Sequence, residues 1–449
     1  MQWMTQHVLI VLGVLVVALA VVFVLQQRRT PQSAAAWVLF MVLVPYVAVP
    51  LFVMLGFRKQ GSRYPPVTLT PADPRHRADS PDAALLTALG APQATGGNHL
   101  ILLDNPESAR RALQDLIDAA QETLDIELYI IAPDAEGEDF VRRLTQKARA
   151  GVKVRLNLDR LGTLFRPRAA LAALLEAGGE LRFFSPFLHP PDNGHMNLRN
   201  HRKLVIADGA HVWAGGRNIG DHYLGPADRA WTDLSFRLSG PAVQPFLDVF
   251  ASDWDVTGRG PAPVRPHRAG ARGDAVLQVV PAGPDEPHDC LYLALTTLIH
   301  QARRRVWISS PYFVPTEPLQ LALTTAARKG VDVRILLPQR SNQRIADIAR
   351  GPYLRDLQDA GATILRHPRM LHAKAGLIDD TGWVGSANFD IRSLLLNFEL
   401  ALFCHDTAST AALDAWFAAN EAACTRGLAP ARLPRRVLEG VFRLGAPML

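Results

Sequence analysis

Cysteine is scarce in this sequence of 449 residues. Cys290, Cys404 and Cys424 show neither a C-x-x-C spacing nor an even number, so neither a disulfide framework nor a zinc cluster is indicated, and a reducing compartment is the simpler interpretation. Carboxylates or histidines at metal-ligand spacing are lacking too, so we expect no metal ion and no other cofactor. The chain also lacks runs of basic residues interleaved with aromatic ones, which disfavours a groove for a nucleic-acid strand.

The excess of positive over negative charge is small. The chain has 48 Lys and Arg against 42 Asp and Glu, a formal net charge of +6. This modest basic balance suits a phosphate-rich partner, either an anionic membrane or nucleic acid. A hydrophobic content of 48% argues against disorder. The length is sufficient for two or three domains with sizeable cores.

Two long apolar runs lie near the N-terminus, at residues 8–25 and 34–57. Each is close to the ~20 residues that cross a bilayer. The first differs from a cleaved signal peptide, because no Lys or Arg precedes it and no small-x-small site follows it. Residues 26–33 allow only a tight turn, so we expect residues 1–60 to form a two-span membrane hairpin with the rest of the protein on one side. Three basic residues follow the second span and two lie in the turn, which leans towards a cytoplasmic body.

Beyond the membrane segment the chain repeats itself. Segments 61–98 and 258–273 have compositions typical of linkers. They bracket two similar halves, 99–257 and 274–425, and an amphipathic segment, 426–449, follows. Each half alternates apolar strands with amphipathic helices and ends this series with HRKLVIAD or HAKAGLID. The pattern predicts one α/β unit with a mixed sheet in each half, and a pseudo-twofold axis relating the halves.

Both halves carry the polar motif H-x-K-x-x-x-x-D. The two copies are His201, Lys203 and Asp208, then His372, Lys374 and Asp379. On a strand, alternation would turn the His and Lys of one copy to the same face, which is costly in a core but useful for holding an anion. A glycine turn and an asparagine follow each copy, ending at Asn218 and Asn388. The pseudo-twofold predicts that the two motifs meet at the interface between the halves.

These motifs resemble the phospholipase D superfamily and, within it, the bacterial cardiolipin synthases. The resemblance rests on NLRNHRKL and GGRNIGD in the first half, on PYFVP, LHAK, GSANFDIRS and LNFE in the second, and on the membrane hairpin. It implies duplicated α/β/α sandwich halves around a pseudo-twofold active site. It also implies an integral, multi-pass enzyme of the bacterial inner membrane that acts on phosphatidylglycerol among anionic lipids. The implied reaction joins two phosphatidylglycerol molecules into cardiolipin and glycerol through a phosphatidyl-histidine.

Phosphatidyl transfer needs a nucleophile, an acid for the leaving alkoxide, and donors for the phosphoryl charge. Two histidines with an ordinary pKa of about 6.5 can divide the first two tasks. We expect His201 to be the nucleophile and His372 the acid and base. The superfamily resemblance favours this order, although the sequence is symmetric and the roles could be exchanged. Lys203 and Lys374 would hold the non-bridging oxygens as point charges, helped by the two asparagines.

The resemblance also implies an acid that orients each histidine. Glu399, in LNFE, is the candidate for His372, and Asp233, in WTDLSF, the candidate for His201. Asp208 and Asp379 are counted with the catalytic motif. Because each ends a strand just before a turn, an Asx turn suffices to explain them, and we expect them to support the motif without transferring protons.

Other functions use parts of the same pattern. In a phospholipase D, water would take the second step and phosphatidic acid would accumulate. A nuclease would use the two motifs on a nucleic-acid phosphodiester, but a membrane hairpin fits a lipid substrate better. A non-enzymatic scaffold leaves the duplicated motifs unexplained. The near-helical apolar spacing of residues 435–449 fits either an interfacial membrane helix or a last core helix.

Overall fold

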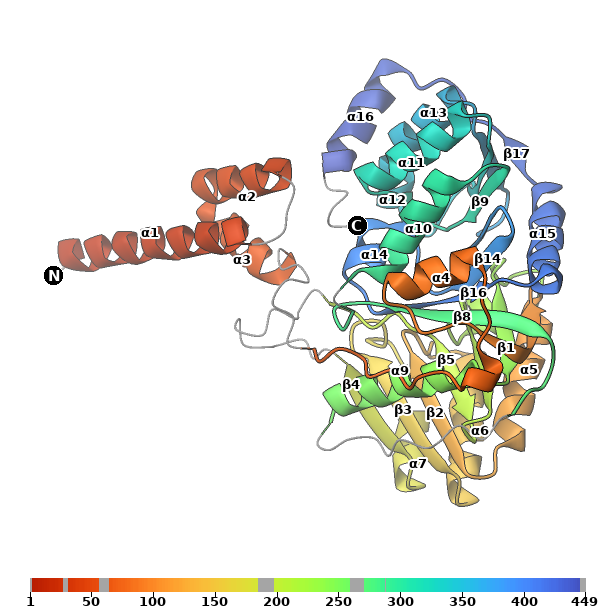
Figure 1. The fold of residues 1–449 in the computed structure, drawn as a ribbon. Helices are drawn as coiled ribbons and strands as arrows, with labels where there is room; N and C mark the ends of the chain where they lie inside the picture. Colours follow the sequence, from red (N-terminus) through yellow and green to blue (C-terminus); the bar gives the residue numbers. More distant parts are fainter. Residues whose placement is uncertain are drawn as a thin grey trace. The chain divides into compact units, whose positions relative to one another are not determined.

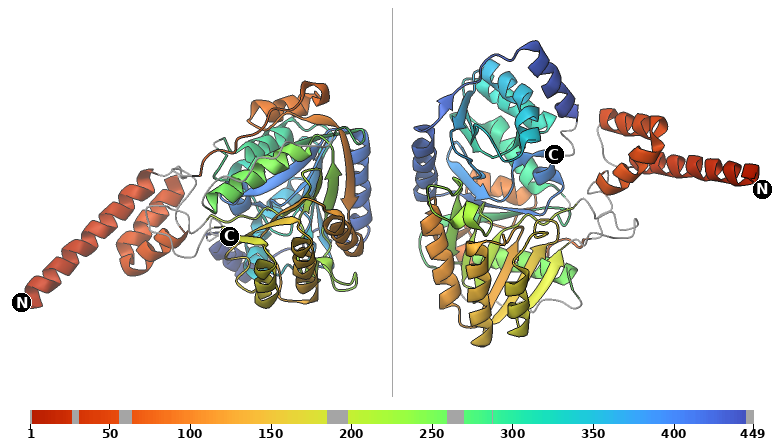
Figure 2. Two further views of the ribbon diagram at one scale, coloured as in Figure 1. Left: turned by 90° about the horizontal axis from the view of Figure 1, so that it is seen from below. Right: turned by 180° about the vertical axis from the view of Figure 1, so that it is seen from behind.

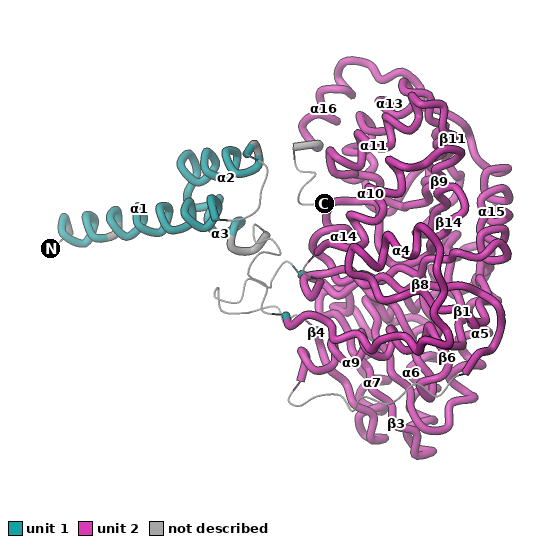
Figure 3. The backbone as a smooth tube through the Cα atoms, in the orientation of Figure 1, with its two compact units in different colours: residues 1–64, 186–198 teal, residues 65–185, 199–449 magenta. Residues whose placement is uncertain are grey.

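The computed structural model describes residues 2–26, 31–55, 64–184, 198–258, 270–286 and 288–444. The chain divides into two compact units (Figure 3), residues 1–64 with 186–198, and residues 65–185 with 199–449.

The first unit is helical. Its helices are α1 (Gln2–Gln26), α2 (Pro31–Leu43) and α3 (Pro45–Leu55). Val24, Met41 and Phe52 are buried in a small core among them. Within the described residues, only α1 is long and apolar enough to cross a membrane.

The second predicted span differs from the expectation. The stretch 34–57 is divided between α2 and α3, and Val44 separates the two helices. Pro45 has no N–H to donate to the preceding turn, and its ring disfavours helical geometry at the residue before it. The structure therefore supports one spanning helix and not the expected pair. The basic residues on which the orientation count rested, Arg28, Arg29, Arg58, Lys59 and Arg63, lie outside the described residues.

The second unit is built on one mixed sheet, whose strand order among the described residues is β17-β12-β11-β9-β13-β14-β16-β8-β1-β7-β6-β5-β2-β3-β4. The strands of the first half are β1 (Thr95–Leu103), β2 (Thr123–Leu128), β3 (Lys153–Asp159), β4 (Glu180–Phe184), β5 (Leu204–Ala207), β6 (His211–Gly215) and β7 (Ser235–Ser239). Those of the second half are β8 (Ala275–Ala282), β9 (Arg305–Ser309), β11 (Asp332–Pro338), β12 (Thr363–His367), β13 (Ala375–Ile378), β14 (Thr381–Gly385), β16 (Glu399–Cys404) and β17 (Thr425–Arg426). A separate small sheet pairs β10 (Phe313–Val314) with β15 (Phe389–Asp390).

The strand order confirms the duplicated α/β fold. β1 and β8 pair antiparallel where the halves join, at Thr95 with Leu277 and Asn98 with Ala275. Moving outward from this junction, β7, β6, β5, β2, β3 and β4 are matched in order by β16, β14, β13, β9, β11 and β12. The motif strands β5 and β13 thus occupy equivalent places.

Helices cover both faces of the sheet (Figures 1 and 2). One face carries α5 (Pro106–Ala119), α6 (Ala135–Arg149) and α7 (Arg168–Glu176) in the first half, and α10 (Cys290–Gln301), α11 (Glu317–Arg328), α12 (Arg344–Ala349) and α13 (Gly351–Asp359) in the second. The other face carries α9 (Val243–Val256) and α15 (Thr407–Glu421). Short elements are η1 (Pro74–His76), α4 (Pro81–Ala88), α8 (Asp221–Leu224) and α14 (Ile391–Leu395), and a longer helix, α16 (Leu433–Leu444), lies near the C-terminus.

Strand alternation explains the layers. Leu204 and Ile206 of β5 lie in the core under α9 and α15, which both halves share, whereas Val205 and Ala207 lie in the core under α5 and α6. Successive residues of a strand point to opposite faces, so an apolar strand such as β5 can serve two cores at once. The shared core joins the halves along the face that carries α9 and α15.

The segments outside the halves also contain ordered structure. The described part of 61–98 includes η1, α4 and the first residues of β1, and Leu86 of α4 belongs to the core of the second half. Most of segment 258–273 lies outside the described residues, as do residues 445–449 of the C-terminal segment.

Candidate active site

Each predicted histidine and lysine lies just before a central strand. His201 and Lys203 precede β5, and His372 and Lys374 precede β13. All four residues are buried. They belong to the same compact unit, and the two histidines border one cavity. The structure therefore brings the two motifs together.

The backbone before each motif strand pairs with the opposite half. His201 N–H donates to Phe398 O at 2.9 Å, and His372 N–H donates to Thr232 O at 2.7 Å. Both contacts belong to short parallel bridges, Asn200 with Phe398 and Leu371 with Thr232. These two exchanges are related by the pseudo-twofold.

The exchange corrects the predicted pairing of histidines and acids. Asp233 was expected at His201 and Glu399 at His372, but Glu399 contacts His201 and Asp233 contacts His372. Each acid directly follows the residue whose carbonyl accepts the other half's histidine N–H, so it arrives beside that histidine. The repeat places each acid in its own half along the sequence, and only the bridge between the halves decides which histidine it meets.

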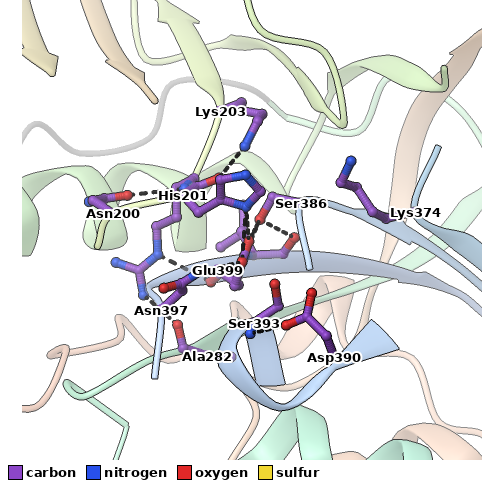
Figure 4. Close-up of polar contacts among 12 residues, drawn as sticks. Asn200, His201, Lys203, Ala282, Lys374, Ser386, Asp390, Ser393, Asn397 and Glu399 are labelled. Atoms are coloured by element: carbon purple, nitrogen blue, oxygen red, sulfur yellow. Dashed lines mark hydrogen bonds and ion pairs between the residues drawn. The ribbon is translucent and has the colours of Figure 1, made fainter. Parts of the chain in front are cut away.

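Glu399 contacts the Nδ1 edge of the His201 ring (Figure 4). His201 Nδ1 lies 2.9 Å from Glu399 Oε1 and 3.0 Å from Oε2, and Ser386 Oγ donates to Oε2 at 2.5 Å. Burial alone would raise the pKa of Glu399, but His201, Lys203 and Ser386 together hold it below its usual range, so the side chain is a carboxylate. A carboxylate accepts the Nδ1 proton, which leaves the Nε2 lone pair of His201 available.

Burial lowers the pKa of His201 to about 4, although Glu399 opposes the shift. His201 is therefore neutral near pH 7 and able to act as a nucleophile.

His372 has the equivalent arrangement. Its Nδ1 lies 2.7 Å from Asp233 Oδ2, and Lys374 Nζ lies within 3.0 Å of both ring nitrogens. Burial lowers the pKa of His372 to about 3, and the Lys374 charge acts in the same direction. Burial would raise the pKa of Asp233, but His372, Lys374 and Arg217 outweigh it and lower the value to about 2. With Nδ1–H donated to the Asp233 carboxylate, Nε2 of His372 is unprotonated in the unliganded site.

The two glycine turns differ at the residue that contacts the acid. Gly216 and Ser386 occupy equivalent places in GGRN and GSAN. A Cβ on Gly216 would lie 2.2 Å from Asp233 Oδ1, so the first turn needs glycine. Glu399 is one methylene longer, and in its turn the serine supplies a hydrogen bond to the carboxylate. Ser386 was not among the residues predicted from the sequence; aligning the two turns against the two acids would have pointed to it.

The lysines turn towards their histidines. Lys203 Nζ donates to His201 O at 2.6 Å, and Lys374 Nζ donates to His372 O at 2.5 Å. Burial lowers the pKa of Lys203 to about 7 and that of Lys374 to about 8. A bound phosphate would favour the charged form of both, because an opposite charge nearby offsets desolvation.

The motif aspartates lie at the far end of the motif strands, and the structure does not bring them to the histidines. β5 and β13 each have four residues, which span about 13 Å. Asp208 and Asp379 have φ of 52° and 48°. Each carboxylate accepts three consecutive backbone N–H groups, those of Gln121, Glu122 and Thr123 or those of Arg303, Arg304 and Arg305. The geometry corrects their inclusion in the catalytic set, because they clamp the turns that lead into β2 and β9.

The cavity at the histidines has a volume of about 320 Å³. Asn218 and Asn388 both line it, as predicted. Asn218 Oδ1 accepts from Ile130 N–H at 3.3 Å, and Asn388 Oδ1 is buried with no hydrogen-bond partner among the described residues. Two aromatic rings, which were not predicted from the sequence, stand edge-on to the histidines. Tyr129 lies 4.9 Å from His201 and Tyr223 lies 5.4 Å from His372, measured between ring centroids.

Within the described ranges, no three His, Cys, Asp or Glu side chains gather as they would around a metal ion.

The residue that follows His201, Arg202, belongs to a buried charge network. Arg202, fully buried, donates to Asp253 at 2.6 Å, to Asp285 at 2.9 Å and to the Glu399 carbonyl at 3.1 Å. Burial and the nearby Asp253 raise the pKa of Glu127 well above its usual value. One guanidinium thus connects α9 of the first half with β16 and with the turn after β8 in the second. The position between His201 and Lys203 carried no signal for this, because the second motif has alanine there.

Comparison with known proteins agrees with this geometry. The profile of the family described as "Cardiolipin synthase, PLD-like domain" matches residues 113–254 and 295–420, one segment in each half. Cardiolipin synthase A of Pseudomonas entomophila (strain L48) is 33% identical over 403 residues, which cover 85% of this chain and 84% of the relative. Cardiolipin synthase A of Pseudomonas aeruginosa (strain LESB58) is 32% identical over 416 residues, which cover 87% and 85%.

A solved structure supports the fold. The crystal structure of phosphatidylserine synthase from Haemophilus influenzae superposes with a TM-score of 0.60 at 14% identity, over 78% of this chain and 95% of that one. Taken together with the two crossed histidine–acid pairs, these matches show that the chain belongs to the cardiolipin synthase family with phospholipase D-like domains and is a phospholipid phosphatidyltransferase.

Proposed function

We propose that the protein condenses two phosphatidylglycerol molecules into cardiolipin and glycerol through a phosphatidyl-histidine. The observation that carries the proposal is the pair of neutral histidines on one cavity, each held at Nδ1 by a carboxylate of the opposite half. Each histidine is also contacted by the lysine of its own motif. Two histidines so placed can act on the same phosphorus atom from opposite sides. The names of the relatives, all cardiolipin synthase A, agree with this substrate class.

In the first step His201 Nε2 attacks the phosphorus of one phosphatidylglycerol. The P–N bond forms as the P–O bond to the headgroup glycerol breaks, and protonated His372 gives its proton to the departing alkoxide. Glycerol leaves and the phosphatidyl group stays on His201. Lys203 and Lys374 stabilise the charge on the non-bridging oxygens.

In the second step His372, now neutral, takes the proton from a hydroxyl of the second phosphatidylglycerol. The hydroxyl oxygen attacks phosphorus, the P–N bond breaks, and cardiolipin leaves. His201 is again neutral and His372 is again protonated, so the cycle closes without a net change in the enzyme.

The first step requires a protonated His372, whose pKa in the unliganded site is lowered to about 3. The bound phosphodiester supplies the missing stabilisation. Its negative charge draws the Lys374 ammonium away from the ring nitrogens and favours the imidazolium form of His372, because an opposite charge at close range raises a histidine pKa. Substrate binding and protonation of the acid are thereby coupled.

We propose that α1 anchors the enzyme in the bacterial inner membrane, next to its lipid substrates. Five Lys or Arg residues follow α1, at positions 28, 29, 58, 59 and 63. If α1 is the one crossing, all five lie on the side of the body, which favours the cytoplasmic side. Reporter fusions after residue 64 test this orientation.

The deciding experiment is product analysis by mass spectrometry. Purified protein is incubated with phosphatidylglycerol vesicles, alongside His201→Ala and His372→Ala. Cardiolipin and glycerol from the wild type, absent from both variants, support the proposal. Phosphatidic acid as the main product would instead identify a phospholipase D with the same two-histidine chemistry.

A second experiment tests the order of the histidines. The covalent phosphatidyl-enzyme should form slowly and then accumulate in His372→Ala, which lacks both the acid of the first step and the base that activates the acceptor in the second. It should be absent from His201→Ala. The reverse pattern would exchange the two roles.

A further inference from the structure

Two arginines border the cavity at its His201 end. Arg199 precedes His201 by two residues and is 6% exposed, and Arg392 lies on α14 of the second half. Both line the same cavity as the two histidines. The cavity is therefore lined by two guanidinium groups, and the carboxylate of Asp390 lines it as well.

The surroundings of these arginines favour an anion. Burial lowers the pKa of Arg392, and the charge of Arg199 adds to the shift. Tyr129 and the carboxylates of Asp390 and Asp159 oppose it. Arg199 Nη1 forms an ion pair with Asp159 Oδ1 at 3.8 Å. The Asp159 carboxylate is already engaged by the backbone N–H groups of Leu161, Gly162 and Asn200. An anion between the guanidiniums would reduce their mutual repulsion and take charge-assisted hydrogen bonds from both.

The pseudo-twofold separates this pair from the reacting phosphate site. The motif lysines, which contact the two histidines, come in equivalent positions, one in each half. By sequence equivalence the counterpart of Arg199 is Met370, two residues before His372, and the counterpart of Arg392 is His222, four residues after Asn218. Neither counterpart lines the cavity. The extra positive charge thus lies at one end only, as a site for a second anionic group requires.

We propose that Arg199 and Arg392 form a second phosphate subsite, which binds the phosphodiester of the acceptor phospholipid while its hydroxyl attacks the phosphatidyl-histidine. This inference rests on the proposed function, because only a phospholipid acceptor brings a second phosphate. The donor's single phosphate is the one under attack between the histidines. A bidentate guanidinium suits a phosphodiester better than an ammonium does. The subsite would select a phospholipid alcohol over water and over small alcohols.

The test compares acceptors with and without a phosphate. Wild type, Arg199→Gln, Arg392→Gln and the double variant are reconstituted as full-length protein with phosphatidylglycerol vesicles, with and without added ethanol. Cardiolipin, phosphatidylethanol and phosphatidic acid are quantified by mass spectrometry. Arg328→Gln, an exposed arginine of α11 away from the cavity, is the matched control for the loss of one positive charge.

We expect each single variant to lower the rate of cardiolipin formation at least about tenfold, since each removes a charge-assisted hydrogen bond. Formation of phosphatidylethanol should stay within about twofold of the wild type, because that acceptor brings no phosphate. The apparent KM for phosphatidylglycerol as acceptor should rise, and Arg→Lys at either position should restore only part of the loss.

Equal losses of cardiolipin and phosphatidylethanol, in variants whose thermal unfolding matches the wild type, would overturn the subsite and place the arginines in the shared first step. If Gln at these positions prevents folding, the ratio of cardiolipin to phosphatidylethanol is measured in the Arg→Lys variants instead and tests the subsite in the same way. Absence of cardiolipin from the wild type itself would refute the proposed function and with it the need for an acceptor subsite. Phosphatidylethanol produced by that same wild type would show that the two-histidine chemistry nevertheless operates.

Discussion

The crossing of acids and histidines makes a prediction about partial reactions. Glu399 holds His201, the proposed nucleophile, and Asp233 holds His372, the proposed acid and base. Glu399→Gln keeps the size of the side chain but removes the negative charge that fixes the Nδ1–H tautomer. The first step should therefore fail in Glu399→Gln. Asp233→Asn weakens His372 both as the acid of the first step and as the base of the second, so it should form the phosphatidyl-enzyme slowly and fail to release it.

The magnitude follows from the contacts. A hydrogen bond to a charged group contributes about 1.5–3 kcal/mol, which is roughly 10- to 150-fold in rate at about 1.4 kcal/mol per decade. An incorrect tautomer adds to this, and a positioned acid or base contributes about 10²–10⁴-fold. We expect overall turnover to fall by about 10²–10⁴ in either variant. Ser386→Ala, which removes only the 2.5 Å hydrogen bond to Glu399, should cost much less, roughly tenfold.

The assay is intact-protein mass spectrometry after rapid mixing with phosphatidylglycerol in detergent micelles. The added mass of one phosphatidyl group should accumulate in Asp233→Asn and be absent from Glu399→Gln. Accumulation in Glu399→Gln and not in Asp233→Asn would refute this assignment, since it would mean that each acid serves the other histidine or that the histidine roles are exchanged. The two explanations separate by comparison with His201→Ala and His372→Ala.

Three further predictions concern stability and membrane contact. Lys203→Met should abolish turnover yet raise the melting temperature at pH 6. Burial lowers the pKa of Lys203 in the folded protein to about 7 from an ordinary 10.5, so below pH 7 the buried charge lowers the stability of the wild type. The difference in melting temperature between variant and wild type should shrink as the pH rises from 7 towards 10.5. A melting temperature at pH 6 below that of the wild type would contradict this. Asp208→Asn and Asp379→Asn should lower the free energy of unfolding by about 1–3 kcal/mol, while the turnover of the folded fraction stays near the wild-type value. Denaturant unfolding and product assays on the same samples check this. A large loss of turnover without loss of stability would show that these residues take part in catalysis. On α16, Leu433, Val437, Leu438 and Val441 are exposed and Arg435 and Arg436 lie beside them, so a fluorophore at Leu438→Cys should be quenched by brominated lipids in nanodiscs. Unchanged emission would reject a membrane role for this helix.

Much of the fold was predictable because local periodicity in the sequence indicates its strands and helices. Strand alternation in HRKLVIAD and HAKAGLID, and the same order of helices and strands around them, indicate two α/β units. The paired β1 and β8 and the matching strand order on either side confirm that architecture. Apolar length was a weaker guide at the N-terminus, where Pro45 divides the second run into two helices.

The site was only partly predictable. Residue type and repetition identified the two histidines, both lysines and the two asparagines, all of which lie around one site. The same reasoning placed the motif aspartates with them, although a four-residue strand carries Asp208 and Asp379 to the opposite end. It also gave no signal for Tyr129 or Tyr223, because single tyrosines at strand or helix ends are common in cores.

By itself, the sequence determined the duplicated α/β halves and the chemistry of the motifs, since both are set by residues close together in the chain. The tertiary structure alone decided which acid meets which histidine, that Arg202 connects the two halves, and that Arg199 and Arg392 border the same cavity. Each of these depends on contacts between residues far apart in the sequence. Such contacts are set by how the two halves pack across the pseudo-twofold, and no local pattern records that packing.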